Sequence, residues 1–343
     1  MATHLVTGGA GFLGEQTARA LQARGERVRI LDILDAPDLP AGIERVQADI
    51  CDATRVREAM AGVDVVHHNA AMVPLTKAGS RFWQVNVEGT ETALQAARAT
   101  GVRFFIHVST SAVFGLPEHC PITDDSPLRP LEAYGRAKLE GERRVERAAS
   151  AGLATAIVRP RTMVGKGRLG IFQILHEWVR EGRKVYVIGD GNSPFQMLHA
   201  DDAVDFMLRL AEQRKPGVYN IGAARYGTLR EDLGALIRHA GTRARVVGIP
   251  AAPTIAALRL ADWLRLSPLA PWHYLTYHKA FFFDLSRPMR ELGWQPRYGN
   301  QETLIESYDW FLAQREASER EASRSTHRKA VRQGIIWVLK RLS

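Results

Sequence analysis

The stretch His4-Leu5-Val6-Thr7-Gly8-Gly9-Ala10-Gly11-Phe12-Leu13-Gly14 decides the fold of this chain. Its first residues form a short apolar run typical of a buried strand, and a helical pattern begins at Gly11 and reaches Arg24. Glycines between a strand and a helix let the backbone turn tightly and approach a diphosphate group, and the first N–H groups of the helix are free to bind it. This context favours a dinucleotide-binding turn over a purely structural glycine turn.

Strand and helix patterns alternate through the N-terminal half of the chain. Apolar, β-branched runs occupy residues 4–6, 27–31, 45–47, 64–67, 104–108 and 154–158, and helical patterns occupy residues 11–24, 54–61, 80–99 and 132–149. Such alternation predicts the α/β class, with a Rossmann-type doubly wound parallel sheet covered by helices on both faces.

The spacing of the patterns loosens after Pro160. Short strands at 184–188 and 218–221 sit among helical patterns at 171–181, 203–212 and 229–239. We therefore expect a dinucleotide-binding domain with the catalytic residues over residues 1–160, a smaller substrate-binding lobe over 161–316 with an interleaved boundary, and a tail over 317–343.

Two carboxylates follow the second and third strands. Asp32 lies 18 residues after Gly14. A carboxylate there accepts hydrogen bonds from both ribose hydroxyls and repels a 2′-phosphate, so it favours NAD over NADP. A cap of the following loop is the alternative for Asp32. Asp49, with Ile50 beside it, follows the next strand, where an adenine amino group would lie.

The net charge of +9 is concentrated at the C-terminal end of the chain. Residues 321–343 carry +5, which leaves +4 for the other 320 residues. The body also lacks a basic cluster with interleaved aromatic residues, so we do not expect a nucleic-acid partner.

The remaining composition is that of an ordinary soluble protein. Two cysteines cannot form a disulfide framework, no apolar stretch reaches the roughly 18 residues of a membrane span, and no Cys/His cluster has metal-ligand spacing. We expect a cytoplasmic protein without a metal.

The tail has the pattern of a basic amphipathic helix. Its apolar residues recur at helical spacing, and five basic residues surround them: Val331, Ile335, Val338, Leu339 and Leu342, with Arg328, Lys329, Arg332, Lys340 and Arg341. This pattern predicts weak peripheral contact with an anionic membrane, and a solvated or self-docked helix is the alternative.

Tyr134 and Lys138 lie one helical turn apart on one face. The ammonium of Lys138 can lower the pKa of the phenol and bond the nicotinamide ribose, while Tyr134 exchanges a proton with a substrate hydroxyl. Upstream, a strand ends in Ser109-Thr110-Ser111, which places hydroxyls at the carboxyl edge of the sheet, where ligands bind. One hydroxyl can bond the substrate oxygen, and a capped turn is the alternative.

Together these segments resemble the extended short-chain dehydrogenase/reductase family, the NAD-dependent epimerase/dehydratase group, over residues 3–312. The motifs that carry the resemblance are the glycine turn, Asp49, His68-Asn69-Ala70-Ala71, Asn86-Val87-Glu88-Gly89-Thr90, Ser109-Thr110-Ser111-Ala112-Val113-Phe114-Gly115, Tyr134-x3-Lys138 and Arg159-Pro160.

The resemblance implies catalytic and cofactor roles. Thr110 would be the hydroxyl partner, Tyr134 the acid/base and Lys138 the residue that tunes it. The implied NAD-binding residues are Gly8, Gly11, Phe12, Leu13, Gly14, Asp32, Asp49, Ile50, Ala70, Ala71, Asn86, Ser109, Tyr134, Lys138 and Pro160. It also implies a homodimer through the helices that hold Asn86 and Tyr134.

The residues after Thr110 narrow the reaction. Family members that dehydrate or decarboxylate sugars carry carboxylates there, and this chain has Ser111 and Ala112. Epimerisation and plain alcohol/ketone interconversion remain, on a sugar or nucleotide-sugar-like substrate. A non-catalytic NAD-binding protein is a further alternative, which the Tyr134/Lys138 pair disfavours.

Two features leave the substrate open. Residues 189–202 resemble the segment that nucleotide-sugar enzymes use beside the diphosphate, but the arginines of that segment and of residues 278–284 are absent. Arg161, Arg168 or Arg225 could substitute for them. An aromatic stripe is similar to the 3-beta-hydroxysteroid dehydrogenase branch, which favours a lipid-like hydroxyl, and ordinary core is its alternative. The stripe comprises Trp263, Trp272, Tyr274 and Phe281-Phe282-Phe283.

Overall fold

The computed structural model describes residues 1–36, 38–73, 79–168, 171–263 and 271–322. The chain divides into two units that alternate along the sequence. The first unit comprises Met1–Met163, Ala200–Ala224 and Phe283–Arg297, and the second comprises Val164–His199, Arg225–Phe282 and Tyr298–Ser343.

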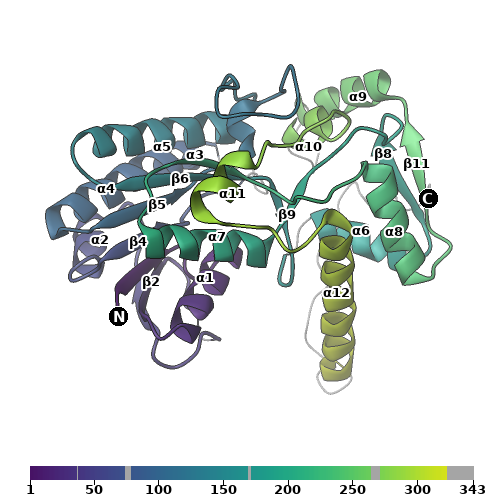
Figure 1. Ribbon diagram of the computed structural model, residues 1–343. Helices are drawn as coiled ribbons and strands as arrows, with labels where there is room; N and C mark the ends of the chain where they lie inside the picture. Colours follow the sequence, from purple (N-terminus) through teal and green to yellow (C-terminus); the bar gives the residue numbers. More distant parts are fainter. Residues whose placement is uncertain (37, 74–78, 169–170, 264–270, 323–343) are drawn as a thin grey trace. The chain divides into compact units, whose positions relative to one another are not determined.

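The first unit contains a parallel sheet of seven described strands in the order β10-β6-β5-β4-β1-β2-β3 (Figure 1). The strands are β1 (Thr3–Thr7), β2 (Arg27–Asp32), β3 (Glu44–Gln47), β4 (Val65–His68), β5 (Phe104–Val108), β6 (Thr155–Pro160) and β10 (Gly217–Ile221). The predicted doubly wound α/β fold is confirmed.

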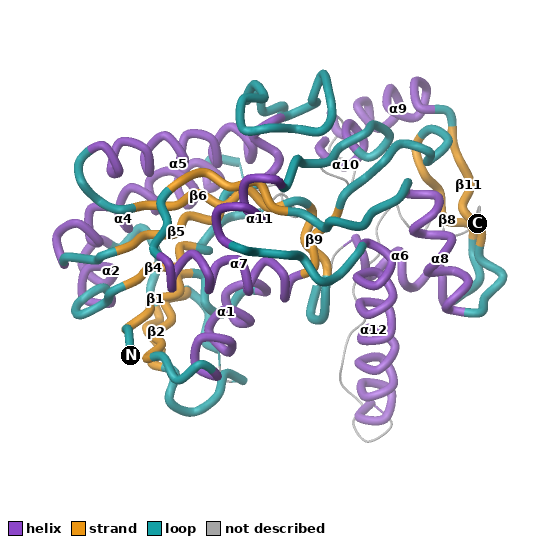
Figure 2. Tube along the Cα trace, in the orientation of Figure 1, coloured by secondary structure: helices purple, strands orange, loops and turns teal. Residues whose placement is uncertain are grey.

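Helices cover both faces of this sheet (Figure 2). On one face, Leu5, Val66 and Phe105 belong to a buried cluster with apolar residues of α2 (Ala53–Ala59), α4 (Gly89–Thr100) and α5 (Ala133–Ser150). On the other face, α1 (Phe12–Ala23) packs beside α7 (Ala200–Gln213), and α11 (Ser286–Leu292) packs against α7 and β10. Because both faces are covered, strands such as β5 are buried along their whole length.

The strand at 218–221 was expected in the substrate lobe, and this expectation is wrong. The strand is β10, which pairs in parallel with β6 at the edge of the main sheet, and the helix expected at 203–212 is α7 of the same unit. A periodic pattern identifies the type of an element, whereas its pairing partner depends on contacts far apart in the sequence.

The helix expected at 80–99 has three parts. α3 (Arg81–Trp83) leads into a π-helical turn at Gln84–Glu88, and α4 follows. The Thr90 hydroxyl donates to the carbonyl of Asn86 at 2.8 Å, and a Cβ built on Gly141 would lie 2.8 Å from that carbonyl oxygen. The wide turn therefore lies in close contact with the backbone of α5. Such turns are frequent at functional sites.

The second unit holds a parallel strand pair and six described helices or short strands. These are β8 (Lys184–Ile188) paired with β11 (Arg245–Ile249), β9 (Met197–His199), α6 (Ile171–Arg180), α8 (Leu229–Ala240), α9 (Ala251–Trp263), α10 (Pro271–Thr276) and α12 (Asn300–Ala322). Asn300 joins three segments, since it bonds the backbone of Phe195 and Met197 and the carboxylate of Asp232.

The aromatic stripe is largely core where the structure describes it. Tyr274 and Phe281 are buried in the second unit, and Phe283 is buried in the first. The side chains of Trp263 and Trp272 lie outside the described residues, and so does the predicted tail helix. Within the described part of the chain, every helix is too short or too polar to cross a membrane.

Candidate active site

The glycine turn forms a cradle in which side chains do not fit. Gly8 has a φ of +66°, and its carbonyl accepts the N–H of Gly11 at 3.1 Å. A Cβ on Gly14 would lie 2.0 Å from the carbonyl oxygen of Gly8, so helix α1 approaches the turn at backbone distance. The helix begins after Gly11, which has no side chain to cap it, and the N-terminus of a helix is a general site for anions. This cradle fits the diphosphate of a dinucleotide.

Asp32 holds the glycine turn in place from the end of β2. One carboxylate oxygen accepts the N–H of Ala10 at 3.0 Å, and the other accepts the N–H of Leu34 at 3.0 Å. The loop-capping alternative is therefore present in the structure. Each oxygen keeps a lone pair for a further donor, so the ribose contact stays a prediction.

Ala70 and Ala71 follow β4 next to the glycine turn. The N–H of Ala70 donates to the Thr7 hydroxyl at 3.3 Å, and a Cβ on Gly8 would lie 2.8 Å from that nitrogen. Ala70 therefore borders the cradle, and the cofactor contact of Ala70 and Ala71 stays a prediction.

Further predicted cofactor residues lie at strand ends or at the start of α1. Asp49 follows β3 and accepts the N–H of Cys51 at 3.0 Å, while Ile50 is buried against Gly89. Pro160 ends β6. Phe12 and Leu13 open α1.

Lys138 is buried in α5, and its ammonium donates to the carbonyl of Val108 at 2.6 Å. Burial lowers the pKa of Lys138 to about 8, against the opposing charge of Glu142. The side chain is therefore still mostly a cation at neutral pH. Tyr134, one turn earlier, packs edge-on against Phe82, with ring centroids 6.3 Å apart.

Thr110 follows β5 and caps a short 3-10 helix, Ser111–Phe114. Its hydroxyl oxygen accepts the N–H of Ala112 at 3.2 Å, which leaves its hydrogen to donate elsewhere. A Cβ on Gly135 would lie 2.9 Å from the carbonyl oxygen of Ala112, so the first turn of α5 packs on this short helix. The fold thereby places Thr110 and Tyr134 on adjoining elements.

A buried ion pair anchors α5 to the sheet. Arg159 on β6 donates to both oxygens of Glu142 on α5, at 2.6 Å from Nη2 and 3.0 Å from Nε, and both side chains are almost fully buried. The hydroxyl of Ser109 donates to the same carboxylate. Since Glu142 lies one turn after Lys138, the pair fixes the helix that carries the predicted catalytic residues Tyr134 and Lys138. The hydrogen of the Ser109 hydroxyl is therefore already used, and the contact of Ser109 with the cofactor stays a prediction.

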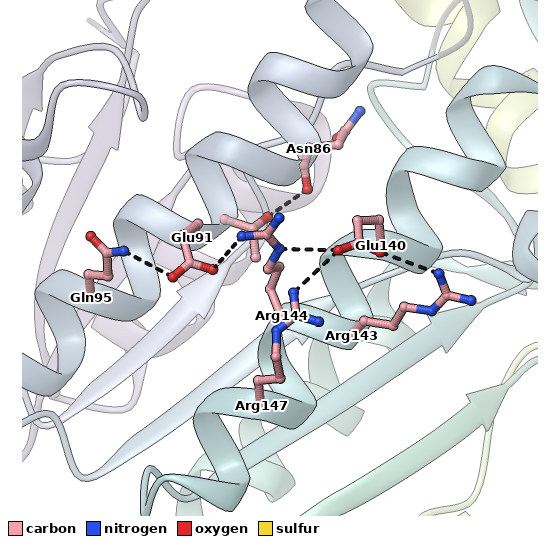
Figure 3. A network of polar contacts seen from close by, with 8 residues as sticks. Asn86, Glu91, Gln95, Glu140, Arg143, Arg144 and Arg147 are labelled. Atoms are coloured by element: carbon pink, nitrogen blue, oxygen red, sulfur yellow. Dashed lines mark hydrogen bonds and ion pairs between the residues drawn. The ribbon is translucent and has the colours of Figure 1, made fainter.

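A second, partly exposed network joins α4 to α5 (Figure 3). Arg144 bridges Glu91 on α4 and Glu140 on α5, with both contacts at 3.2 Å, and Arg143 and Arg147 also bond Glu140. Exposed ion pairs contribute little individually, roughly 0–1 kcal/mol each. Their effect here is to align the helix after Asn86 with the helix that holds Tyr134.

Arg161 and Arg225 are two of the three candidate substitutes for the missing arginines. Arg161 is buried, donates to the Ser111 hydroxyl at 2.9 Å and lies 5.9 Å above the ring of Phe283. Arg225, in the second unit, pairs with Glu302 at 2.9 Å. Arg161 thus stands beside the residue that follows Thr110.

Sequence reasoning missed three polar residues around the site. Glu132 is the N-cap residue just before α5, Glu142 follows Lys138 by one turn, and Asn69 follows β4. The spacing of Glu142 from Lys138 was a usable signal, because a carboxylate four residues after a buried lysine shares its face. No local pattern indicated the burial of Glu132 or Asn69.

The sequence model of the "NAD dependent epimerase/dehydratase family" matches residues 4–222. The chain belongs to this family. Its members are NAD-dependent enzymes of the extended short-chain dehydrogenase/reductase group, and the cradle described above fits that cofactor.

Similar proteins cover nearly the whole chain. The uncharacterized protein y4nG of Sinorhizobium fredii is 42% identical over 98% of this chain and 85% of its own length. A 4-hydroxy-2-methyl-3-oxo-4-farnesyl-3,4-dihydroquinoline-1-oxide ketoreductase of Stigmatella aurantiaca is 33% identical over 87% of this chain and 93% of its own. The crystal structure of UDP-glucose 4-epimerase from Thermotoga maritima has a TM-score of 0.76 at 24% identity, over 91% of this chain and 99% of that one, and shows the shared fold.

Substitution of Glu142 by leucine is expected to destabilise the protein by about 3–5 kcal/mol, because Arg159 is left buried without its counter-charge. Chemical denaturation measures this free energy of unfolding. The double variant with Arg159→Met is expected to recover most of the loss. A single variant within 1 kcal/mol of the wild type would show that the pair does not anchor the helix.

Glu132 predicts a pH-dependent stability. Burial raises the pKa of its carboxyl to about 7, and Oε1 has no hydrogen-bond partner among the described residues. The folded protein therefore holds this proton more tightly than the unfolded chain, so the carboxyl destabilises the fold as pH rises from about 4.5 to 7 and above.

Glu132→Gln is accordingly expected to stabilise the protein at pH 8, by about 1–3 kcal/mol after allowance for partial exposure, and to change little at pH 5. Urea denaturation at the two pH values measures the difference. Glu146→Gln, an exposed position on the same helix, is the control and should show no such dependence. An equal effect of Glu132→Gln at both pH values would refute the assignment.

Proposed function

We propose that this protein catalyses hydride transfer at a secondary alcohol or ketone carbon, most directly on a sugar or nucleotide-sugar-like substrate. The observation that carries the proposal is the buried ammonium of Lys138, held one helical turn from Tyr134 by the carbonyl of Val108. Family membership supports the use of NAD.

Thr110, Tyr134 and Lys138 would each have a separate role in moving the proton of the reacting oxygen. Thr110 donates a hydrogen bond to the reacting oxygen, and the Tyr134 phenol exchanges the proton of that oxygen. The Lys138 cation stabilises the phenolate that forms when Tyr134 has given its proton away. NAD, when bound, would accept the hydride in its oxidised form and donate it in its reduced form.

The cofactor would be held by the N-terminal half of the chain. The glycine cradle would bind the diphosphate, Asp32 the ribose hydroxyls of the adenosine, and Asp49 the adenine amino group. Lys138 would bond the nicotinamide ribose, and the backbone after Pro160 the nicotinamide amide. Ala70, Ala71 and Asn86 would line the cleft.

Epimerisation and simple oxidation both fit this set of groups. Ser111 and Ala112 supply no carboxylate beside Thr110, and the Ser111 hydroxyl is bonded to Arg161. This arrangement disfavours the second proton abstraction that dehydration requires. Oxidation of a sugar hydroxyl, and its reduction on the other face in an epimerase, require only the side chains of Thr110, Tyr134 and Lys138 together with the cofactor.

Reduction of a lipid-like ketone is the second candidate, and one structural observation favours it. Residues 195–198, where nucleotide-sugar enzymes are expected to contact the diphosphate, are fully buried in the second unit, and Phe195 packs against Tyr277 with ring centroids 4.8 Å apart. These side chains offer no cation to a diphosphate. The similar Stigmatella protein is named as a ketoreductase of a farnesylated substrate.

Tyr134→Phe is expected to lower kcat by about 10²–10⁴-fold, because the proton of the reacting oxygen loses its acceptor. NAD binding should persist, since the phenol oxygen is not needed for the cradle. Steady-state kinetics together with calorimetric titration of NAD separate the two effects. Turnover that survives the substitution would overturn the catalytic assignment.

Cofactor retention distinguishes the candidate reactions. An epimerase regenerates NAD within each cycle, so the purified protein should release close to one NAD per chain on denaturation and should interconvert UDP-glucose and UDP-galactose without net NADH. A ketoreductase should instead oxidise added NADH with a long-chain β-keto ester, followed at 340 nm. If the protein oxidises NADH with the keto ester and does not interconvert the UDP-sugars, the second candidate replaces the sugar proposal.

We further propose a cytoplasmic homodimer through α4 and α5, and weak contact of the tail with anionic membranes. Light scattering of the full-length chain tests the dimer. Vesicle sedimentation with phosphatidylserine, with and without residues 321–343, tests the tail. Unchanged vesicle binding after the deletion would contradict the membrane role.

A further inference from the structure

A buried cation follows the end of strand β6. Arg161 comes directly after Pro160, and its backbone N–H donates to the carbonyl of Ile221, the last residue of β10, at 2.9 Å. The side chain is almost fully buried. Because its backbone is fixed to the central sheet, the guanidinium of Arg161 has a defined place within the first unit.

The guanidinium contacts two neutral groups. Its Nη1 donates to the Ser111 hydroxyl at 2.9 Å, and its carbon lies 5.9 Å from the centre of the Phe283 ring. The cation two residues earlier is different, since Arg159 donates to the carboxylate of Glu142. A carboxylate offsets the field of the cation with which it pairs, whereas a hydroxyl and an aromatic ring leave the positive charge in place. In the interior, such a charge acts over a longer distance than it does in water.

The hydroxyl that binds this guanidinium belongs to the four-residue helix Ser111–Phe114, which Thr110 caps. The first turn of α5 packs on the same short helix, because a Cβ on Gly135 would lie 2.9 Å from the carbonyl oxygen of Ala112. Gly135 directly follows Tyr134 in the sequence. The guanidinium and the turn that carries the phenol therefore contact adjacent residues of one short helix.

We propose that Arg161 is a positioning residue of the proposed reaction, whose buried charge favours the phenolate of Tyr134 over the protonated phenol. A nearby opposite charge favours the ionised form of an acid. Lys138 supplies one cation from the same helix as the phenol, and Arg161 supplies a second from the end of β6, where the Ser111 hydroxyl holds it in place. Arg161 touches no reacting atom and acts through the phenol. The proposal therefore rests on the assignment of Tyr134 as the acid/base of the proposed function.

Other charged side chains also surround this phenol. Glu132 lies just before α5, and Arg136 lies in its first turn. Arg81 lies in α3, whose Phe82 packs edge-on against the Tyr134 ring. Burial raises the pKa of the Glu132 carboxyl to about 7, which is well below the pKa of about 10 of an unperturbed tyrosine. These groups stay unchanged in the variants below, so a difference between variants reports the charge of the guanidinium.

The pKa of the Tyr134 phenol can be measured directly and without a substrate. The full-length protein, labelled with ¹³C at Cζ of tyrosine, is titrated by NMR from about pH 6 to about pH 12, and the signal that is missing from Tyr134→Phe identifies this residue among the 8 tyrosines. Arg161→Met removes the charge and keeps an unbranched side chain. It is expected to raise the pKa of Tyr134 by about half a unit to one unit, the effect of a unit charge roughly 10 Å away at an effective dielectric constant of about 20.

Two matched variants separate the charge of Arg161 from its packing. Arg161→Lys keeps the charge and should keep the pKa of Tyr134 close to that of the wild type, although lysine lacks the fork of the guanidinium. Arg57→Met removes an exposed cation on α2 and should leave this pKa unchanged. No measurable difference between the wild type and Arg161→Met would overturn the proposal, and so would an equal rise in Arg161→Lys or in Arg57→Met. Arg161→Gln provides the same comparison if the methionine variant does not fold.

Failure of this inference can be told apart from failure of the proposed function, because the titration of the phenol requires no turnover. If Arg161→Met leaves the pKa of Tyr134 unchanged while Tyr134→Phe is inactive, the assignment of Arg161 is wrong and the proposed function stands. If the pKa of Tyr134 rises in Arg161→Met while Tyr134→Phe keeps its turnover, the charge reaches the phenol but neither residue serves the reaction, and both assignments are wrong.

Discussion

The buried pair of Arg159 and Glu142 is the interaction on which the site depends. It connects the last strand before the chain leaves the Rossmann half to the helix that carries Tyr134 and Lys138. A buried ion pair is stable only when its geometry is good and the remaining hydrogen-bonding groups of both ions have partners. Here Nε and Nη2 of Arg159 and the hydroxyl of Ser109 all donate to the Glu142 carboxylate. A shift of α5 would break all three bonds, so the helix has one position relative to the sheet.

The fixed position of α5 also determines the surroundings of Lys138, one turn before Glu142. Lys138 can remain charged in the interior because the Val108 carbonyl and the nearby Glu142 carboxylate offset the cost of burying its ammonium. The cation then stands ready to stabilise a phenolate at Tyr134. The same helix touches the short helix after Thr110 through Gly135 and the π-helical turn at Asn86 through Gly141, where only glycine leaves room for the approach. Small residues on α5 thus bring the proton-transfer groups together.

The glycine cradle is shaped mainly by backbone atoms, whereas the surroundings of Thr110 are shaped by side chains. Backbone atoms of Gly8 and Gly14 shape the glycine cradle, while Asp32 fixes the turn through the N–H of Ala10. After Thr110, by contrast, the side chains define the surroundings, because the Ser111 hydroxyl bonds Arg161 and neither Ser111 nor Ala112 is a carboxylate.

The sequence by itself determined the fold class, and it predicted the cofactor turn and the catalytic residues. Roles for Gly8, Gly14, Tyr134 and Lys138 could be proposed because they depend on local spacing, namely a strand followed by a tight turn and two side chains on one helical face. Tertiary structure alone decided that β10 joins the main sheet, that the Ser109 hydroxyl bonds Glu142, and that the Asn69 amide and one carboxyl oxygen of Glu132 are shielded from solvent. Burial, strand pairing and hydrogen-bond satisfaction depend on neighbours that are distant in the sequence, and no local pattern encodes them.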